Sequence, residues 1–381
     1  MQTRNGITKV ECFVVITCIV IVMGLLIPSV AHVRHGGRRA QCATNLKNLA
    51  LASIQVSSVH DQFPGYLNDF GKFDATKSNE EFRSHRKVGA WGVSLLPWLD
   101  EQPTFERWTE DRYAVVAVGQ QIEGTTPDGY LLQAAPDLAI FQCDKDDFDG
   151  DWLGGRNSYI ANNGMCHRGP RHENEWTIVR DDGESVNVDF ARSMSVANGV
   201  FNNKAQAVDE TGQPVAIGPR VRLDDFRDGQ GLTMLFSEST DALPWHRISA
   251  DAIVEALVAV EQPFLYPESS RYIHGMVWHY EDSQGEDSEV RDNAMISAVS
   301  TAMPVQSIHR INGAFQGEPR LSDLARPSSF HVDGVNAAFA DGATRFIQDS
   351  IDYRVYQSLL TPDGQHSEMP KRDHRLGSED F

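Results

Sequence analysis

An uninterrupted apolar run near the amino terminus limits what this chain can fold into more than any other feature. Residues 12–31 read CFVVITCIVIVMGLLIPSVA, which is 20 residues without a charged side chain. At about 1.5 Å per residue, a helix of this length covers the roughly 30 Å hydrocarbon core of a bilayer. The apolar part of a secretory signal peptide is shorter, about 7–15 residues, and no small-residue cleavage pattern closes this run. We therefore expect a membrane helix that the mature protein retains.

A short polar segment stands directly in front of the run. Residues 6–11 read GITKVE, and this sequence resembles the processing site of type IV prepilins, Gly-Phe-Thr-Leu-Val-Glu. The resemblance implies that a prepilin peptidase cuts after Gly6 and methylates the new amino terminus at Ile7. It also implies that Glu11 pairs with the amino terminus of a neighbouring subunit, because an unpartnered carboxylate at the edge of a bilayer core is costly. The alternative is that Glu11 lies at headgroup level and is hydrated.

The charges that flank the run and the prepilin-like leader predict opposite orientations of the chain in the membrane. Arg34, Arg38 and Arg39 follow the run, whereas Arg4 and Lys9 precede it. The positive-inside rule alone would place the large C-terminal part in the cytoplasm. We give precedence to the prepilin-like leader, since a receptor reads it and it marks the short side as cytoplasmic. The expectation is a single-pass inner (cytoplasmic) membrane protein with a cytoplasmic amino terminus and an extracytoplasmic C-terminal domain.

The stretch after the apolar run keeps helical periodicity. Apolar residues recur there at helical spacing, at Leu46, Leu49, Ala50 and Ile54. We therefore expect a leader over residues 1–6 and one helix over residues 7–60, which the Pro64-Gly65 pair then breaks. Short apolar runs between Gly, Pro, Asn and Asp follow, as is typical of strands and loops. Residues 61–381 are expected to form one exported globular domain.

A hairpin is the clearest local fold signal in this domain. Residues 330–347 read FHVDGVNAAFADGATRFI. Apolar side chains alternate along residues 335–339, and Asp341-Gly342 suits a two-residue hairpin turn, whose residues take positive φ. We expect two antiparallel strands on either side of this turn.

Five segments, taken in order along the chain, point to one family. They are Gln41–Ala52 (QCATNLKNLALA), Phe141–Asp146 (FQCDKD), Arg156–Gly164 (RNSYIANNG), Val221–Ser239 (VRLDDFRDGQGLTMLFSES), and His331 followed after nine residues by Asp341-Gly342. Together they resemble the DUF1559 family, prepilin-like proteins with a C-terminal H-x9-D-G segment and a poorly defined biochemical role. The resemblance implies an α+β fold, in which a long N-terminal transmembrane and amphipathic helix packs on a mainly antiparallel, β-rich ectodomain, as in pseudopilins.

Three of the five cysteines lie outside the apolar run, at Cys42, Cys143 and Cys166. The absence of a CxxC pair argues against a structural zinc site. If the helix and the sheet pack face to face, Cys42 and Cys143 can approach within disulfide range. The family resemblance also places a cysteine at both positions and leaves Cys166 unpaired. The alternative is that Cys42 and Cys143 are separate buried thiols.

Two groups of polar residues are candidates for chemistry. One is an aspartate-rich segment that contains Asp144, Asp146, Asp147, Asp149 and Asp151. Calcium prefers oxygen-rich loops, but these aspartates do not have the spacing of an EF-hand. A solvated loop is therefore the favoured interpretation. The other group is His331, Asp341 and Glu238, read as a metal or acid–base set. Asp341 already has a role in the turn, and His331 could cap the same hairpin by hydrogen bonding. We expect no metal, no cofactor and no catalytic residue, because no activated nucleophile or catalytic motif is present.

These features together favour a non-enzymatic protein. The formal net charge of −19 argues against nucleic-acid binding, which needs clustered Lys and Arg. We expect a pseudopilin-like structural or assembly subunit of a type II secretion-like system, with the membrane, prepilin peptidase and other pilin-like subunits as partners. The alternative is a monomeric, membrane-tethered extracytoplasmic protein that binds a ligand or a cation.

The leader generates a first prediction. In cells with an active prepilin peptidase, the mature chain is expected to begin at a methylated Ile7, which mass spectrometry of the amino-terminal peptide measures. Lys9 adds a charge where prepilins have leucine, so Lys9→Leu is expected to keep or raise the cleaved fraction, and Gly6→Val to abolish it. Recovery of intact Met1 from the wild-type membrane fraction contradicts the prediction.

Overall fold

The computed structural model describes most of the chain. The described residues are 9–117, 123–146, 152–169, 174–179, 183–251, 257, 260–280, 299–300, 307–314, 318–370, 372 and 376–377, and within α1 the side chains of residues 24–35 are not described. The predicted cleavage site at Gly6 and Ile7 lies outside these residues, as do Asp147, Asp149 and Asp151.

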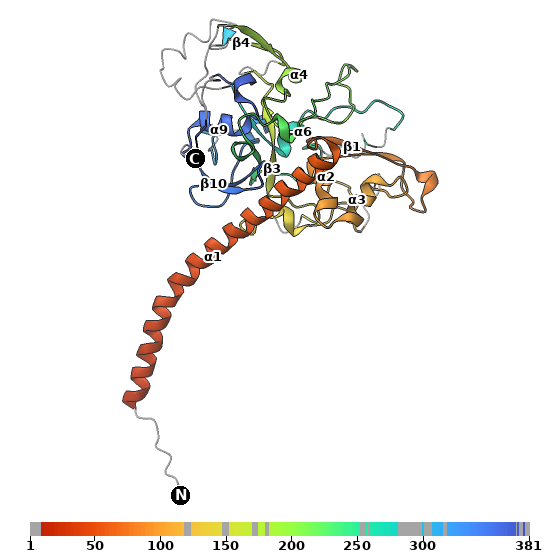
Figure 1. Cartoon of the computed structure of the whole chain (residues 1–381). Coiled ribbons are helices and arrows are strands. Elements are labelled where there is room, and N and C mark those ends of the chain that lie inside the picture. Colours follow the sequence, from red (N-terminus) through yellow and green to blue (C-terminus); the bar gives the residue numbers. More distant parts are fainter. Residues whose placement is uncertain are drawn as a thin grey trace.

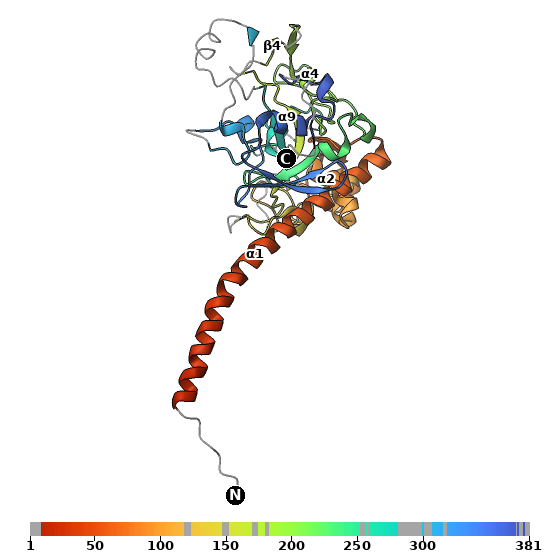
Figure 2. The ribbon, with the colours of Figure 1, turned by 60° about the vertical axis from the view of Figure 1, so that its left-hand side comes forward.

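One long helix dominates the molecule. Helix α1 spans Lys9–His60 as a single element, and its backbone stays helical through Pro28. The N-terminal half extends away from the rest of the chain, and the C-terminal half lies against it (Figures 1 and 2). Asp61 takes a positive φ of 56° directly after the helix, a left-handed conformation that commonly ends helices. Pro64 then prevents the helix from continuing.

The two halves of α1 differ in exposure. From Val10 to Met23 the described side chains are exposed, whereas Leu46, Leu49 and Ala50 are fully buried. No helix in the described part of the chain holds a segment that is both long and apolar enough to cross a bilayer. The membrane helix expected at residues 12–31 is therefore not supported by the structure and stays a prediction.

The domain is built on a five-stranded sheet with the strand order β10-β9-β6-β3-β7. Its strands are β3 (Tyr159–Met165), β6 (Met234–Glu238), β7 (Gly275–Trp278), β9 (Gly334–Phe339) and β10 (Thr344–Gln348). Strands β3 and β7 pair in parallel, and the other three pairings are antiparallel. The chain is thus α+β, with a mixed sheet where the sequence predicted a mainly antiparallel one. The predicted hairpin corresponds to β9 and β10.

Successive residues of β9 point to opposite faces of this sheet, and both faces are buried. Ala338 belongs to the same apolar cluster as Leu46 and Leu49 of α1. Val335 and Ala337 belong to a second cluster, together with residues of helix α9 (Tyr353–Leu360). Because successive side chains of a strand point to opposite faces, α1 covers one face of the sheet and α9 the other. The site described below lies at the α1 face.

Smaller elements surround this sheet. Strands β1 and β2 form a hairpin beside short helices, and β5, β4 and β8 form a three-stranded sheet. Their bounds are β1 Asn68–Phe73, β2 His85–Gly89, α2 Trp91–Leu95, α3 Gln102–Thr109, β4 Trp176–Val179, β5 Ser185–Val188, α4 Phe190–Ser193, α6 Ser270–Ile273, β8 Val299–Ser300 and α8 Leu321–Leu324.

The packing of α1 on the sheet generates a second prediction. Leu49→Ala is expected to lower the free energy of unfolding by about 2–5 kcal/mol, since it removes buried methyl groups and leaves a cavity. Leu51→Ala is the matched control, because Leu51 is 40% exposed on the same helix, and its expected cost is below about 1 kcal/mol. Chemical denaturation of the full chain measures both. Equal costs contradict the packing described here.

Candidate functional site

Four side chains from distant parts of the sequence meet beside α1. They are Cys42 on α1, Cys143 before β3, Glu238 at the end of β6, and His331 before β9. Their sulfur, carboxylate and ring nitrogen atoms all lie within 4.8 Å of one another, and all four residues are buried. Each residue belongs to one of the segments that carried the family resemblance. The fold therefore brings separate sequence motifs to one place.

A disulfide joins the two cysteines. The Cα atoms of Cys42 and Cys143 are 5.1 Å apart, which lies inside the range that a disulfide spans. The bond ties α1 to the segment that leads into β3 and closes a loop with a sequence separation of 101. Cys166 is buried and free, and Cys12 and Cys18 are free and exposed.

A buried imidazole and a buried carboxylate lie against this disulfide. The Nε2 atom of His331 is 3.2 Å from Oε1 of Glu238. The Sγ atom of Cys143 is 3.6 Å from the same imidazole nitrogen and 3.8 Å from the same carboxylate oxygen. Only 7% of His331 and 2% of Glu238 are exposed, so this polar pair lies in the protein interior.

Neighbouring strands hold these groups in place. The backbone N–H of Asn336 donates to Oε2 of Glu238 at 2.7 Å, and its side-chain Nδ2 donates to Oε1 at 2.8 Å. The backbone N–H of Cys143 donates to Oγ of Ser158 at 3.0 Å. Two donors on the carboxylate offset part of the cost of burying it. Glu238 is thus held between β6 and β9, and Cys143 is held by Ser158, the residue directly before β3.

Asp341 has a different role. Its Oδ1 accepts a hydrogen bond from the backbone N–H of Ala343 at 2.8 Å, and Oδ2 is 3.8 Å from Nη2 of Arg345. Gly342 takes a φ of 79° in the same turn, and a Cβ atom there would lie 2.9 Å from Cδ2 of Leu51 on α1. Of the set His331, Asp341 and Glu238, the ligand cluster contains the first and the last. The Nε2 atom of His331 lies beside Glu238 and Cys143, so the structure adds no support to the idea that His331 caps the hairpin.

The aspartate-rich segment contributes no cluster to the described part of the chain. Asp144 is exposed and Asp146 is half-buried, and neither belongs to the group of potential metal ligands found among the described residues. The other three aspartates lie outside those residues. The structure therefore adds no support to the calcium interpretation.

The segments that contribute the four cluster residues lie within a match to a known family. A family model described as "Protein of unknown function (DUF1559)" matches residues 31–354, well over half of the chain. The chain belongs to the DUF1559 family. No curated protein and no solved structure matches it. The matched region includes all four residues of the cluster, so the cluster is a property of the DUF1559 part of the chain.

Sequence reasoning missed this cluster as a unit. It considered Cys42 with Cys143 as a disulfide, and separately His331 with Asp341 and Glu238 as a metal or acid–base set. The four residues are spread over 290 positions of the chain, from 42 to 331, so no spacing rule relates them. The available signal was that each lies in a different DUF1559-like segment.

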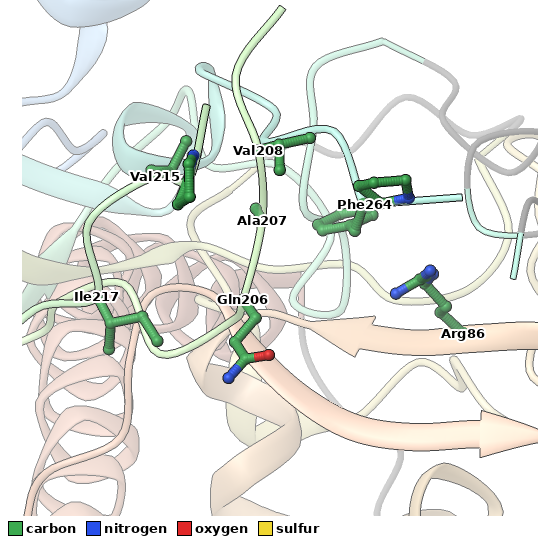
Figure 3. A pocket seen from close by; sticks show the side chains of 9 residues that line it. Arg86, Gln206, Ala207, Val208, Val215, Ile217 and Phe264 are labelled. Atoms are coloured by element: carbon green, nitrogen blue, oxygen red, sulfur yellow. The ribbon is translucent and has the colours of Figure 1, made fainter. Parts of the chain in front are cut away.

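A cavity of about 410 Å³ is a second feature of the domain. Most of the residues that line it are apolar, Val208 and Phe264 among them, and the cation Arg86 lies beside them (Figure 3). The guanidinium Nη2 donates to the carbonyl of Val260 at 2.8 Å and to that of Gln262. Pockets of roughly 300–1,000 Å³ are the size that small ligands occupy.

The disulfide generates a third prediction. The double variant Cys42→Ala/Cys143→Ala is expected to lower the free energy of unfolding by about 2–4 kcal/mol, because the bond no longer constrains a long loop of the unfolded chain. Cys12→Ala/Cys18→Ala is the matched control, since both residues are exposed and free, and it is expected to change stability by less than about 0.5 kcal/mol. Urea denaturation of the full chain measures both. An unchanged midpoint in the first variant contradicts the prediction.

Proposed function

We propose that this DUF1559 protein is a membrane-anchored, pseudopilin-like assembly subunit that displays its acidic domain outside the cytoplasm. In this proposal a prepilin peptidase removes residues 1–6, and the N-terminal half of α1 lies in the inner membrane among similar helices. The domain is a structural element and not an enzyme.

The observation that carries the proposal is the apolar, exposed surface of α1. Ten large apolar side chains between Val10 and Met23 are each 49–73% exposed. Phe13, Val14, Val15 and Ile16 are consecutive, and successive helical residues are rotated by about 100°, so these side chains surround the helix. A helix that is apolar on all sides is normally buried in a protein core or in lipid. The described part of the chain does not cover these side chains, which favours lipid and other helices as their surroundings.

The position of the domain on α1 supports the same proposal. The domain packs on the C-terminal half of the helix, with Cys42 and Leu46 fully buried. The N-terminal half extends beyond the domain (Figure 1). This division gives one half of the helix for packing in a membrane and one half for holding the domain. Glu11 lies in the first turn of the helix.

One observation favours a second candidate, a tethered ligand-binding protein. The cavity beside Arg86 has the size of a small-molecule site. On this reading α1 only anchors a monomer, and the domain holds a ligand. The two candidates differ in whether the apolar halves of neighbouring α1 helices contact one another.

Cysteine crosslinking in membranes is the fourth prediction. Single cysteines placed in turn at positions 12–18, with the native Cys12 and Cys18 replaced by serine where necessary, are to be oxidised in membranes of cells that express the full chain. Seven consecutive positions cover every side of a helix. An assembly subunit is expected to give disulfide-linked dimers at positions that recur every three to four residues.

A chain without a cysteine at positions 12–18 is the control for this experiment. A Cys12→Ser/Cys18→Ser chain keeps the buried Cys166 and is expected to give no dimers. Absence of dimers at all seven positions contradicts assembly through α1 and supports the tethered monomer. Equal dimer yield at every position indicates random collision and contradicts a specific helix interface.

A further inference from the structure

We infer that Cys42, Cys143, His331 and Glu238 form a zinc site when the disulfide is reduced. The oxidised chain holds a disulfide at this place, and the reduced chain holds two thiols, an imidazole and a carboxylate. This donor set, two sulfurs with one nitrogen and one oxygen, is of the kind that Zn²⁺ binds with tetrahedral geometry. The inference does not depend on the assembly function proposed above.

The distances between the donor atoms fit this geometry. Bonds of about 2.3 Å to sulfur and about 2.0–2.1 Å to nitrogen and oxygen, at tetrahedral angles, place nitrogen and oxygen about 3.3 Å apart. The same bonds place sulfur about 3.6 Å from either of them. The observed separations are 3.2 Å between His331 Nε2 and Glu238 Oε1, 3.6 Å between Cys143 Sγ and the imidazole, and 3.8 Å between that sulfur and the carboxylate. Three edges of the tetrahedron are thus already present in the disulfide form.

The surroundings of the site also suit a metal. All four residues are buried, so an ion there is held away from competing water. Asn336 donates two hydrogen bonds to the carboxylate of Glu238, which is the type of outer-shell contact that orients metal ligands. Two thiolates and one carboxylate carry three negative charges, and Zn²⁺ neutralises two of them. Without a cation these charges would be costly to bury together.

A small cavity lies next to the cluster. This cavity of about 10 Å³ is lined by Cys143 and Glu238, with Asp146 and Phe330 among the other residues of its wall. Its volume is close to that of one water-sized probe. Phe330 is 53% exposed, so this cavity lies at the surface side of the cluster. Cys143 and Glu238 thus line a small space on this side of the cluster.

A dithiol can supply the electrons that convert the disulfide to the zinc-binding form. Thiol–disulfide exchange breaks the bond between Cys42 and Cys143 and forms a disulfide in the reductant. Two electrons and two protons pass to the cysteines, which become thiols. Zn²⁺ then displaces both thiol protons and binds two thiolates, neutral His331 and ionised Glu238. Zinc binding therefore retains the reduced state, and reoxidation of the cysteines requires release of the ion.

The test uses the full chain in detergent, reduced with a phosphine that is then removed. The reduced protein is expected to retain one equivalent of zinc after gel filtration, measured by elemental analysis, and the oxidised protein none. With Co²⁺ it is expected to show the sulfur-to-cobalt charge-transfer and visible bands of a tetrahedral thiolate site. His331→Ala is expected to weaken zinc affinity more than about 100-fold, the upper limit for loss of an outer-shell partner.

Controls separate loss of the site from loss of the fold. The oxidised form of each variant must yield the linked Cys42 and Cys143 peptides, and Glu238→Gln replaces His331→Ala if the latter fails this check. Cys12→Ser/Cys18→Ser is expected to bind zinc as the wild type does. Retention of less than about a tenth of an equivalent by the reduced wild type overturns the inference. Wild-type zinc affinity in a folded His331→Ala or Glu238→Gln variant also overturns it.

Discussion

The contact between the C-terminal half of α1 and the central sheet is the constraint on which the rest of the structure depends. One face of β9 is buried because Leu46 and Leu49 of the helix cover it, and the opposite face is buried by α9. If α1 were absent, that sheet face would expose a large apolar surface to water. The domain and the helix therefore stabilise one another, and the domain is not expected to keep this fold without residues of α1.

The polar cluster forms at this contact because α1, the end of β6 and the segment before β9 meet there. Cys42 comes from the helix. Glu238 is the last residue of β6, and His331 lies in the segment before β9. An interior position makes an unpaired carboxylate costly, yet Glu238 is satisfied by Asn336 and by the imidazole. A buried polar group with so many defined partners is specific in geometry. Its hydrogen bonds join β6 to β9 directly beside the disulfide.

Local patterns made part of this fold predictable from the sequence. Helical spacing from Leu46 onward and the turn chemistry of Asp341-Gly342 act over a few residues, so they can be read directly. The parallel pairing of β3 with β7 and the approach of His331 to Glu238 depend on chain topology, which no local pattern encodes. His331 was assigned to the hairpin because it is near that turn in sequence. The fold instead directs its ring toward a strand almost a hundred residues away.

The same junction links the two proposals for this protein. In an assembly subunit, any force on the membrane half of α1 reaches the domain through the buried half of the helix. A disulfide between Cys42 and Cys143 resists separation of helix and sheet at that point, because it is covalent. A zinc ion bound to the same cysteines, with His331 and Glu238, would join α1 to β6 and to the segment before β9 as well. The two states then differ in chemistry but both hold the helix to the sheet, so reduction changes the junction without releasing the domain.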